Sequence, residues 1–391
     1  MGFPLNVAIA SSVRTAVGRA GKKGTLKNTR PDDMAATAMK AAIANVPGLK
    51  GEMIDDVILG CAMPEGEQGL NIARNAVFLA ELPNSVAGET INRFCASGLQ
   101  AIGHAAQMVE TGSAQVVIGG GVESMSMVPM GGNKMSVNPK LVDRYPEAYI
   151  SMGHTAERVA ERFGVSREEQ DRFAVRSHEN ALAAIQAGYF KEEIAPVEAR
   201  VFGRDGESTM VFDTDECPRA GTSMEGLAKL RAVFKAGGTV TAGNASPMND
   251  GAAAAVLMSE ATVKDLGVEP IGYMRGCVAA GCDPDIMGIG PVPAIEKLLK
   301  QTGLSIEDID LFEINEAFAA QSVYCQRELK IDENKLNVSG GAIALGHPLG
   351  CTGAKLSATV LHALKRTGGK FGIVSMCIGG GMGMAGLFEV A

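Results

Sequence analysis

Cys95 stands in surroundings that suit covalent catalysis. It lies in the segment NRFCASG (residues 92–98), between a strand-like stretch and an apolar helix. A cysteine at the N-terminus of a helix is close to free backbone N–H groups and to the positive end of the helix dipole, and both favour the thiolate. We therefore interpret Cys95 as a candidate nucleophile. The alternative is a buried structural cysteine, although burial alone does not explain the small, turn-forming Ala-Ser-Gly that follows.

Two further glycine-rich segments carry reactive side chains. His347 lies in the loop GGAIALGHPLG (residues 340–350). Histidine is the usual base for a cysteine nucleophile, so His347 is a candidate base. Taken in isolation, however, this segment is explained more simply by a histidine that is hydrogen-bonded inside a turn. Cys377 follows a strand-like stretch and precedes a glycine run at residues 379–383. This segment offers a second thiol together with closely approachable backbone N–H groups, as an oxyanion hole requires.

Two other patterns have simpler local explanations. Gly381, Gly383 and Gly386 form a G-x-G-x-x-G pattern, but only five residues follow it, so no helix can complete a dinucleotide-binding unit. Asn315 lies in the segment EINEAFA (residues 313–319), a strand-to-helix junction where a helix N-cap is the simpler interpretation.

The composition limits the class of protein. Of the 391 residues, 49 are glycine without a collagen period, and 46% hydrophobic with 20% charged residues indicates a globular protein. The net charge of −8 disfavours binding to nucleic acid or to anionic membranes. No apolar run approaches the roughly 18 residues of a membrane helix, and the N-terminus has no signal-peptide pattern, so we expect a cytoplasmic protein. The eight cysteines include no C-x-x-C pair, so we expect no metal site.

Strand-like and helix-like stretches alternate up to residue 121 and again after residue 251, which predicts an α/β protein with a mainly parallel sheet. The pattern changes at about residues 122–243. This region has a capping box, Ser166-x-x-Glu169, and a polar stretch at residues 201–226 without a regular signal, so we interpret it as an inserted lid or binding loop. The expected strands are 5–10, 54–59, 116–118, 253–258, 271–278, 311–314, 335–338 and 371–376, and the expected helices are 31–46, 96–109, 155–163, 166–188, 292–302, 316–329 and 354–366.

A weak internal repeat relates residues 95–121 to residues 351–381. Each copy begins with a cysteine, continues through an apolar helix that ends at a Thr-Gly pair, and reaches a short strand and a Gly-Gly-Gly triplet. The repeat predicts two similar α/β halves whose corresponding loops face one another across a pseudo-twofold axis.

Four segments together make the chain resemble the thiolase family. They are N-x-x-C-x-S-G at 92–98, NEAFA at 315–319, GGAIALGHPLG at 340–350 and C-x-G-G-G at 377–381, in the order and spacing of the family. The resemblance implies the α/β thiolase fold, with two βαβαβαββ halves in five layers (αβαβα) and a loop domain inserted in the first. It implies an N-terminal half at 1–121 plus 245–270, a loop domain at 122–244 and a C-terminal half at 271–391.

The resemblance also implies a reaction. Members cleave a 3-ketoacyl-CoA with CoA to give acetyl-CoA and a shortened acyl-CoA, or run the reverse Claisen condensation. Cys95 would carry the acyl group, His347 would take the proton of Cys95, and Cys377 would act as acid and then as base. One oxyanion site would use His347 and a water held by Asn315, and the other the N–H groups of Cys95 and Gly379. CoA is then a co-substrate, and no permanently bound cofactor is expected.

Further positions match family contacts with CoA and the acyl group. Arg219 matches a position near the adenine and phosphate end, Phe234 and Ser246 match positions along the pantetheine, and Met152 and Phe318 match positions at the acyl end. We expect Arg219 and Lys229 to form a cationic patch for the anionic CoA.

At one position the chain differs from a group of thiolases, and this difference separates two activities of the family. Biosynthetic acetoacetyl-CoA thiolases place a histidine directly before the loop Met-Gly, whereas Ser151 precedes Met152 here. This favours the degradative 3-ketoacyl-CoA thiolase of fatty-acid β-oxidation, with the acetoacetyl-CoA enzyme as the alternative.

Three other classes agree less well with these residues. A ketoacyl synthase expects a histidine or other partners in place of Cys377, a cysteine peptidase gives no role to Asn315 or Cys377, and a non-catalytic lipid-binding relative would lose one of the reactive residues. The family forms dimers or tetramers, so we expect a homodimer or homotetramer with the Met-rich segment 124–136 at a contact, and allow association with other β-oxidation enzymes.

Overall fold

A computed structural model describes residues 2–203 and 206–390, and its main β-sheet is mixed. Along the sheet the strands follow the order β11-β12-β13-β10-β1-β9-β5-β3-β4. The expectation of a mainly parallel sheet is wrong, because β3 pairs in parallel with β4 and β5, and β11 with β12, while the other neighbours on this path are antiparallel. The strands are β1 (Val7–Thr15), β3 (Asp56–Gly60), β4 (Ala87–Ile91), β5 (Val116–Ser124), β9 (Asn249–Met258), β10 (Gly272–Gly281), β11 (Leu311–Ile314), β12 (Phe371–Ile378) and β13 (Met382–Glu389), with short strands β2 (Gly18–Arg19) and β6 (Ile194–Ala195) beside them.

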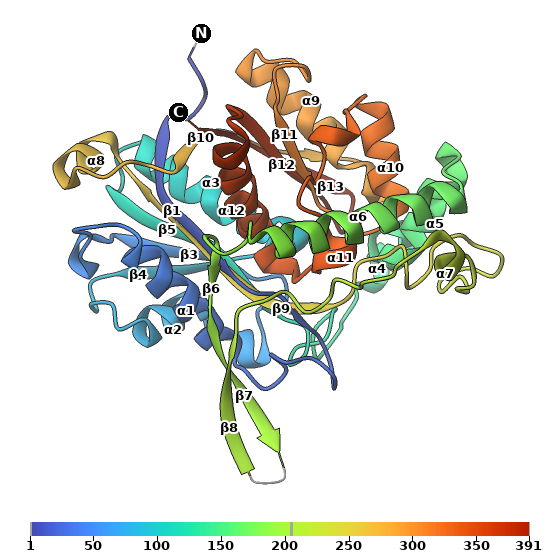
Figure 1. Cartoon of the computed structure of the whole chain (residues 1–391), viewed down its shortest axis with the longest axis horizontal. Helices are drawn as coiled ribbons and strands as arrows, with labels where there is room; N and C mark the ends of the chain where they lie inside the picture. Colours follow the sequence, from blue (N-terminus) through green and yellow to red (C-terminus); the bar gives the residue numbers. More distant parts are fainter. Residues whose placement is uncertain (1, 204–205, 391) are drawn as a thin grey trace.

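Three hydrophobic clusters divide the molecule into five layers, αβαβα (Figure 1). Neighbouring residues on a strand point to opposite faces, so Ile118 packs in the first cluster and Val117 in the second. The first cluster lies under α1 (Pro31–Ala44) and α2 (Ile72–Leu79), the second around α3 (Ser97–Glu110) and α12 (Leu349–Thr367), and the third under α9 (Pro291–Thr302) and α10 (Ala319–Glu328). Helices α3 and α12 therefore form the central layer.

Glycines let the two central helices cross in close contact. A Cβ atom on Gly98 would lie 2.7 Å from the carbonyl oxygen of Gly350, and one on Gly353 would lie 2.3 Å from the backbone nitrogen of Leu99. The N-termini of α3 and α12, which follow Cys95 and His347, are thereby brought together.

The sheet order reflects two similar halves. The strand order β1-β9-β5-β3 in one half matches the order β10-β13-β12-β11 in the other half. The two halves meet where β1 pairs with β10. The repeat correctly relates α3 and β5 to α12 and β12, but the two glycine triplets are not equivalent. Residues 119–121 lie inside β5, whereas Gly380 and Gly381 have φ of 82° and form the turn before β13.

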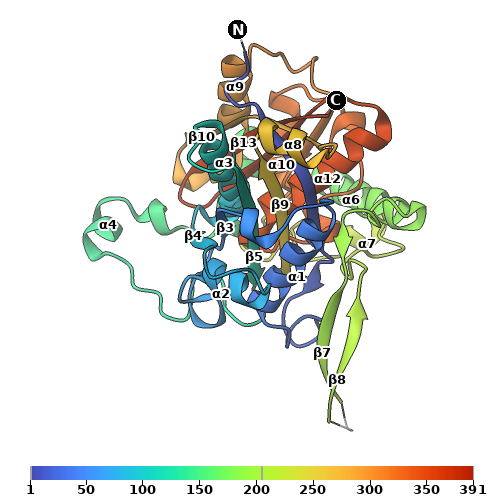
Figure 2. The same cartoon turned by 90° about the vertical axis from the view of Figure 1, so that its left-hand side faces the viewer.

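Several element predictions were wrong. Residues 335–338 form no strand, since only Leu336 makes an isolated bridge, to Phe312. Strand β13 was missed because its glycine-rich, almost wholly buried sequence shows no alternation. The stretch 201–226 contains most of a hairpin, β7 (Val197–Gly203) and β8 (Gly206–Phe212), and the short helix α7 (Met224–Ala228). Most of the hairpin is solvent-exposed and extends away from the body, so no buried face marks it in the sequence (Figures 1 and 2).

The region between β5 and β9 also carries α4 (Pro139–Arg144), α5 (Met152–Phe163) and α6 (Arg167–Ala187). The capping box at Ser166 is present, and α6 ends at Gly188 in the left-handed conformation. Helices α5 and α6 share a hydrophobic cluster with α9 and α10. Among the described residues, no helix combines the length and apolar character that a membrane crossing requires. The limits 122–244 for a separate loop domain stay a prediction.

Candidate active site

Cys95 lies in a short 3₁₀ turn, Phe94–Ala96, that leads directly into α3. Its side chain is buried, with 8% exposed. Burial raises the pKa of Cys95 to about 11, while the N–H groups of Gly379 and of Cys95 itself lower it and Glu123 raises it. The N–H donors expected at a helix N-terminus are thus present, but burial outweighs them, so the resting thiol is protonated and needs a base.

His347 is fixed as a neutral imidazole with a defined tautomer. Its Nδ1 lies 2.6 Å from Thr352 Oγ1, and that hydroxyl donates to the carbonyl oxygen of Pro348 at 2.9 Å. Because the hydroxyl proton is committed to Pro348, Thr352 accepts from Nδ1–H and leaves the lone pair on Nε2. Burial, with a further contribution from Lys355, lowers the pKa of His347 to about 3. His347 therefore rests with Nε2 unprotonated.

Asn315 shares the site with His347. Its Nδ2 lies 3.3 Å from His347 Nε2, and its Oδ1 is buried without a hydrogen-bond partner among the described residues. The helix that follows, α10, begins only after Phe318, so the interpretation of Asn315 as its N-cap is wrong. The unpaired oxygen is an acceptor for a donor that enters the site.

Cys377 lies near the end of β12 and is fully buried. Its thiol donates to Gln321 Oε1 at 3.6 Å. Burial raises the pKa of Cys377 well above its ordinary value, and Cys95 is the next largest cause, so the two thiols lie within electrostatic reach of each other. Cys377 therefore rests as a proton donor beside the candidate nucleophile.

The backbone N–H of Gly379, from the other half of the molecule, lowers the pKa of the Cys95 thiol. A Cβ atom at this position would lie 3.4 Å from Met152 Sδ, so Met152 lies over the turn. Two backbone N–H groups from elements far apart in the sequence therefore favour the thiolate form of Cys95.

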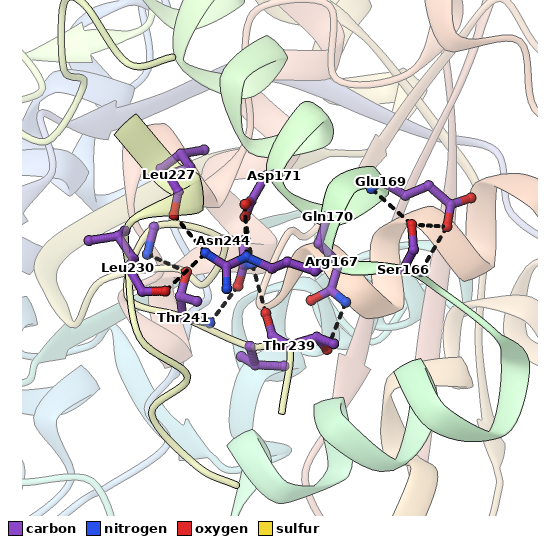
Figure 3. A network of polar contacts seen from close by, with 12 residues as sticks. Ser166, Arg167, Glu169, Gln170, Asp171, Leu227, Leu230, Thr239, Thr241 and Asn244 are labelled. Carbon is purple, nitrogen blue, oxygen red and sulfur yellow. Dashed lines mark hydrogen bonds and ion pairs between the residues drawn. The ribbon is translucent and has the colours of Figure 1, made fainter. Parts of the chain in front are cut away.

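An apolar cluster adjoins Cys377 and contains three of the predicted acyl and pantetheine contacts, Met152, Phe234 and Phe318. The rings of Phe234 and Phe318 meet edge to face with centroids 6.1 Å apart. Ser246 donates its N–H to the carbonyl oxygen of Ala317 at 3.0 Å, which places it at the edge of the cluster. The segment that carries Phe234 is held in place by α6, because Asp171 accepts from Asn244 at 2.9 Å and Gln170 donates to Thr239 at 2.9 Å (Figure 3).

Arg219 lines a pocket of about 250 Å³ together with Arg19 and His178, next to Ala245 and Pro247 on either side of Ser246. The N–H of Arg219 donates to His178 Nδ1 at 3.2 Å. Lys229 does not contribute as expected, since it pairs with Glu225 at 2.7 Å and is not among the lining residues. Arg19, 200 positions earlier in the chain, supplies the second cation.

Sequence reasoning missed several residues that organise the site. Glu123 is fully buried at the end of β5 and accepts from the N–H groups of Ala62, Met63 and Gly350 and from the Gln68 amide. Burial raises the pKa of Glu123, and these donors lower it. A single acidic residue in an otherwise apolar strand was the available signal for Glu123. Thr352 and Gln321, by contrast, show their roles only in three dimensions.

Two buried thiols, a neutral histidine and the nearby backbone N–H groups of Cys95 and Gly379, on a fold of two α/β halves, indicate an enzyme that transfers acyl groups through a cysteine. The chain belongs to the thiolase family: residues 7–261 match the thiolase N-terminal domain and residues 268–390 the thiolase C-terminal domain.

Individual relatives agree with this assignment. The chain is 52% identical over 387 residues to the 3-ketoacyl-CoA thiolase of Bacillus subtilis, covering 98% of each chain, and 47% identical over 389 residues to that of Citrobacter koseri, again covering 98% of each. Among solved structures, the acetyl-CoA acetyltransferase of Bacillus anthracis superposes with a TM-score of 0.90 at 42% identity and full coverage of both chains. The human mitochondrial 3-ketoacyl-CoA thiolase superposes with a TM-score of 0.90 at 40% identity and 99% coverage of both.

Proposed function

We propose that the protein is a 3-ketoacyl-CoA thiolase that transfers an acyl group from a 3-ketoacyl-CoA to CoA through a thioester on Cys95. The observation that carries the proposal is the close crossing of α3 and α12, which brings Cys95 and His347 together from different halves of the molecule, with Cys377 near enough for Cys95 to raise its pKa. The curated relatives named above support the substrate class.

In the first half-reaction, His347 Nε2 takes the proton of Cys95, and the thiolate attacks the 3-keto carbon. The bond between C2 and C3 then breaks and expels the enolate of acetyl-CoA. Cys377 protonates that enolate at carbon, which leaves a thiolate at Cys377 and an acyl thioester at Cys95. The enolate oxygen would be stabilised by His347 and by a water held at the unpaired Oδ1 of Asn315.

In the second half-reaction, the Cys377 thiolate takes the proton of the incoming CoA thiol. The CoA sulfur attacks the thioester, and Cys95 leaves and recovers its proton from His347. The N–H groups of Cys95 and Gly379 would bind the thioester oxygen, and one donor of this kind typically contributes about 10²–10³ in kcat.

CoA would enter through the pocket at Arg219. Arg19 and Arg219 would attract its phosphates, Ser246 and Phe234 would border the pantetheine, and the acyl chain would extend toward Met152 and Phe318. A local pair of arginines reconciles an anionic substrate with an acidic protein. CoA is then a co-substrate, and the protein's own side chains supply the acid–base chemistry.

The acetoacetyl-CoA thiolase activity remains the second candidate, because the similar Bacillus anthracis structure is an acetyl-CoA acetyltransferase. Ser151 stands before Met152 and contacts His154 Nδ1 through its hydroxyl at 2.7 Å. We favour the degradative role in β-oxidation, in the cytoplasm, and as a homodimer or homotetramer. Comparison of kcat/KM for thiolysis of acetoacetyl-CoA with that of a C8–C16 series of 3-ketoacyl-CoAs separates the two activities.

The nucleophile is tested by intact-protein mass spectrometry after incubation with acetyl-CoA. The wild type should gain one acetyl group, and Cys95→Ala should gain none and lose turnover. Acetylation of Cys95→Ala to the same extent as the wild type would refute the assignment.

A further inference from the structure

The residue before the nucleophile has an unusual backbone. Phe94 has φ of 44°, in the left-handed region, although it carries an aromatic side chain. A Cβ substituent is disfavoured in this region, and a bulky residue persists there only where its surroundings hold it. The strain falls directly beside Cys95, at the start of α3.

Two polar side chains bind both backbone groups of Phe94. Asn92 Oδ1 accepts from the N–H of Phe94 at 2.8 Å, while Asn92 Nδ2 donates to the carbonyl oxygen of Ala62 at 3.0 Å. The hydroxyl of Ser97 donates to the carbonyl oxygen of Phe94 at 2.7 Å and accepts from the N–H of Arg93 at 2.8 Å. Ser97 is fully buried, whereas Phe94 itself is 39% exposed, so packing around its ring alone does not hold this backbone.

The geometry of the peptide bond connects these contacts to catalysis. The carbonyl of Phe94 and the N–H of Cys95 belong to one planar, trans peptide unit and point in opposite directions. A side chain that fixes the Phe94 carbonyl therefore also fixes the direction of the Cys95 N–H. That N–H also lowers the pKa of the Cys95 thiol.

We propose that Asn92 and Ser97 are positioning residues that hold Phe94 in the left-handed conformation and thereby aim the Cys95 N–H at the thioester oxygen of the acyl-enzyme. This inference rests on the proposed function for its catalytic consequence. A purely structural role for the two side chains is the competing explanation, and the two make different predictions for a glycine at position 94.

The test combines alanine variants of Asn92 and Ser97 with a glycine at position 94, which relieves the backbone strain of the positive φ. Asn92→Ala and Ser97→Ala should each lower kcat for thiolysis by about 10–10²-fold, with little change in KM. The decrease in kcat should be at most as large as the decrease expected when a whole oxyanion donor is removed. Glycine adopts positive φ without a steric penalty. Phe94→Gly alone should therefore remain within a few fold of the wild type, and adding it to either alanine variant should restore kcat by about tenfold.

Alkylation of Cys95 by iodoacetamide across pH gives a readout that needs no substrate. In Asn92→Ala and Ser97→Ala the apparent pKa of Cys95 should rise, because its N–H no longer favours the thiolate, and Phe94→Gly should reverse the shift. Asn71→Ala is the matched control. Asn71 also has positive φ, 66°, and its side chain also holds a turn, by accepting from the N–H of Arg74, but it is the N-cap of α2. This control should leave the alkylation profile unchanged.

Wild-type turnover with an unchanged alkylation profile in both alanine variants would overturn the proposal, and so would double variants as impaired as the single ones. Failure of the wild type to form an acetyl-enzyme would instead refute the proposed function. The alkylation profiles would then still decide whether Asn92 and Ser97 aim the Cys95 N–H.

Discussion

Burial, more than charge, sets the protonation of the residues at the centre of the site. It raises the pKa of Cys95 and Cys377 and lowers that of His347, so all three rest in their neutral forms. In a site of this kind, the Cys95 thiol keeps its proton until a bound substrate can take up the negative charge of the thiolate. The chemistry is therefore expected to start on substrate binding, from a thiol rather than from a preformed thiolate.

This protonation state predicts that the alkylation rate of Cys95 rises only at high pH. Since its folded pKa lies at about 11, above the ordinary value of about 8.5, the rate of modification by iodoacetamide should stay low near pH 7 and keep rising above pH 9. The rate at Cys95 is read by peptide mass spectrometry, with Cys95→Ala as the blank. A rate that reaches its plateau by pH 8 would show a resting thiolate and contradict the prediction.

The acid–base role of Cys377 predicts unequal effects on two half-reactions. Cys377→Ala should slow thiolysis by about 10²–10⁴, the usual scale for an acid–base group. Acetyl transfer from acetyl-CoA to Cys95 should survive better, because a thiolate leaving group needs a proton less than a carbanion does.

Steady-state and single-turnover kinetics measure the two rates separately. The matched control is Cys325→Ala, since Cys325 is an equally buried thiol whose hydrogen bond goes to the carbonyl oxygen of Gly288 and which the proposed reaction does not use. Equal thiolysis by Cys377→Ala and Cys325→Ala would refute the role of Cys377.

At the scale of elements, the crossing of α3 and α12 brings the two halves of the site together. The helices touch through glycines, and each helix begins within two residues of a reactive side chain. Their separation therefore controls the distance between Cys95 and His347.

A methyl group at this crossing should damage both stability and activity. In Gly98→Ala the added Cβ meets backbone atoms of Gly350 and Ala354 at 2.7 and 2.8 Å, so we expect a loss of about 1–3 kcal/mol in the free energy of unfolding and a lower kcat. Gly103→Ala, on the same helix, meets mainly the movable Cys277 side chain at 2.9 Å and also gains helix propensity. Denaturant unfolding of both variants checks the prediction, which equal stabilities would contradict.

Local signals made some elements and most of the reactive residues predictable. Strand β11 was predicted with its observed limits, and the capping box at Ser166 marked the start of α6, because both depend on neighbouring residues. The reactive residues stood out by their types and their glycine-rich motifs. Arg19 and Thr352 were missed because their roles arise from contacts between distant segments or from the direction of a side chain, which no short motif encodes, whereas Glu123 was marked only as a single acidic residue in an apolar strand.

At the scale of the whole molecule, the segment that contains α4 projects from the body (Figure 2). The Met-rich stretch 124–136 was expected to form a contact between subunits, and Met125 instead packs against a small buried cluster that includes Cys95. The exposed apolar side chains continue further along the chain, through α4 and the turn after it. They are Met130, Met135, Val137, Leu141, Val142, Tyr145 and Tyr149.

We expect this segment to contact a second copy of the chain, because so many exposed apolar side chains on one projecting arm are costly in water unless they are covered. Leu141→Glu combined with Tyr145→Glu should therefore lower the oligomeric state measured by light scattering, from tetramer to dimer or from dimer to monomer. Val211→Glu, which charges an exposed apolar site on β8 instead, should leave the oligomer intact. A wild-type protein that is already a stable monomer, or a double variant with an unchanged mass, would contradict the prediction.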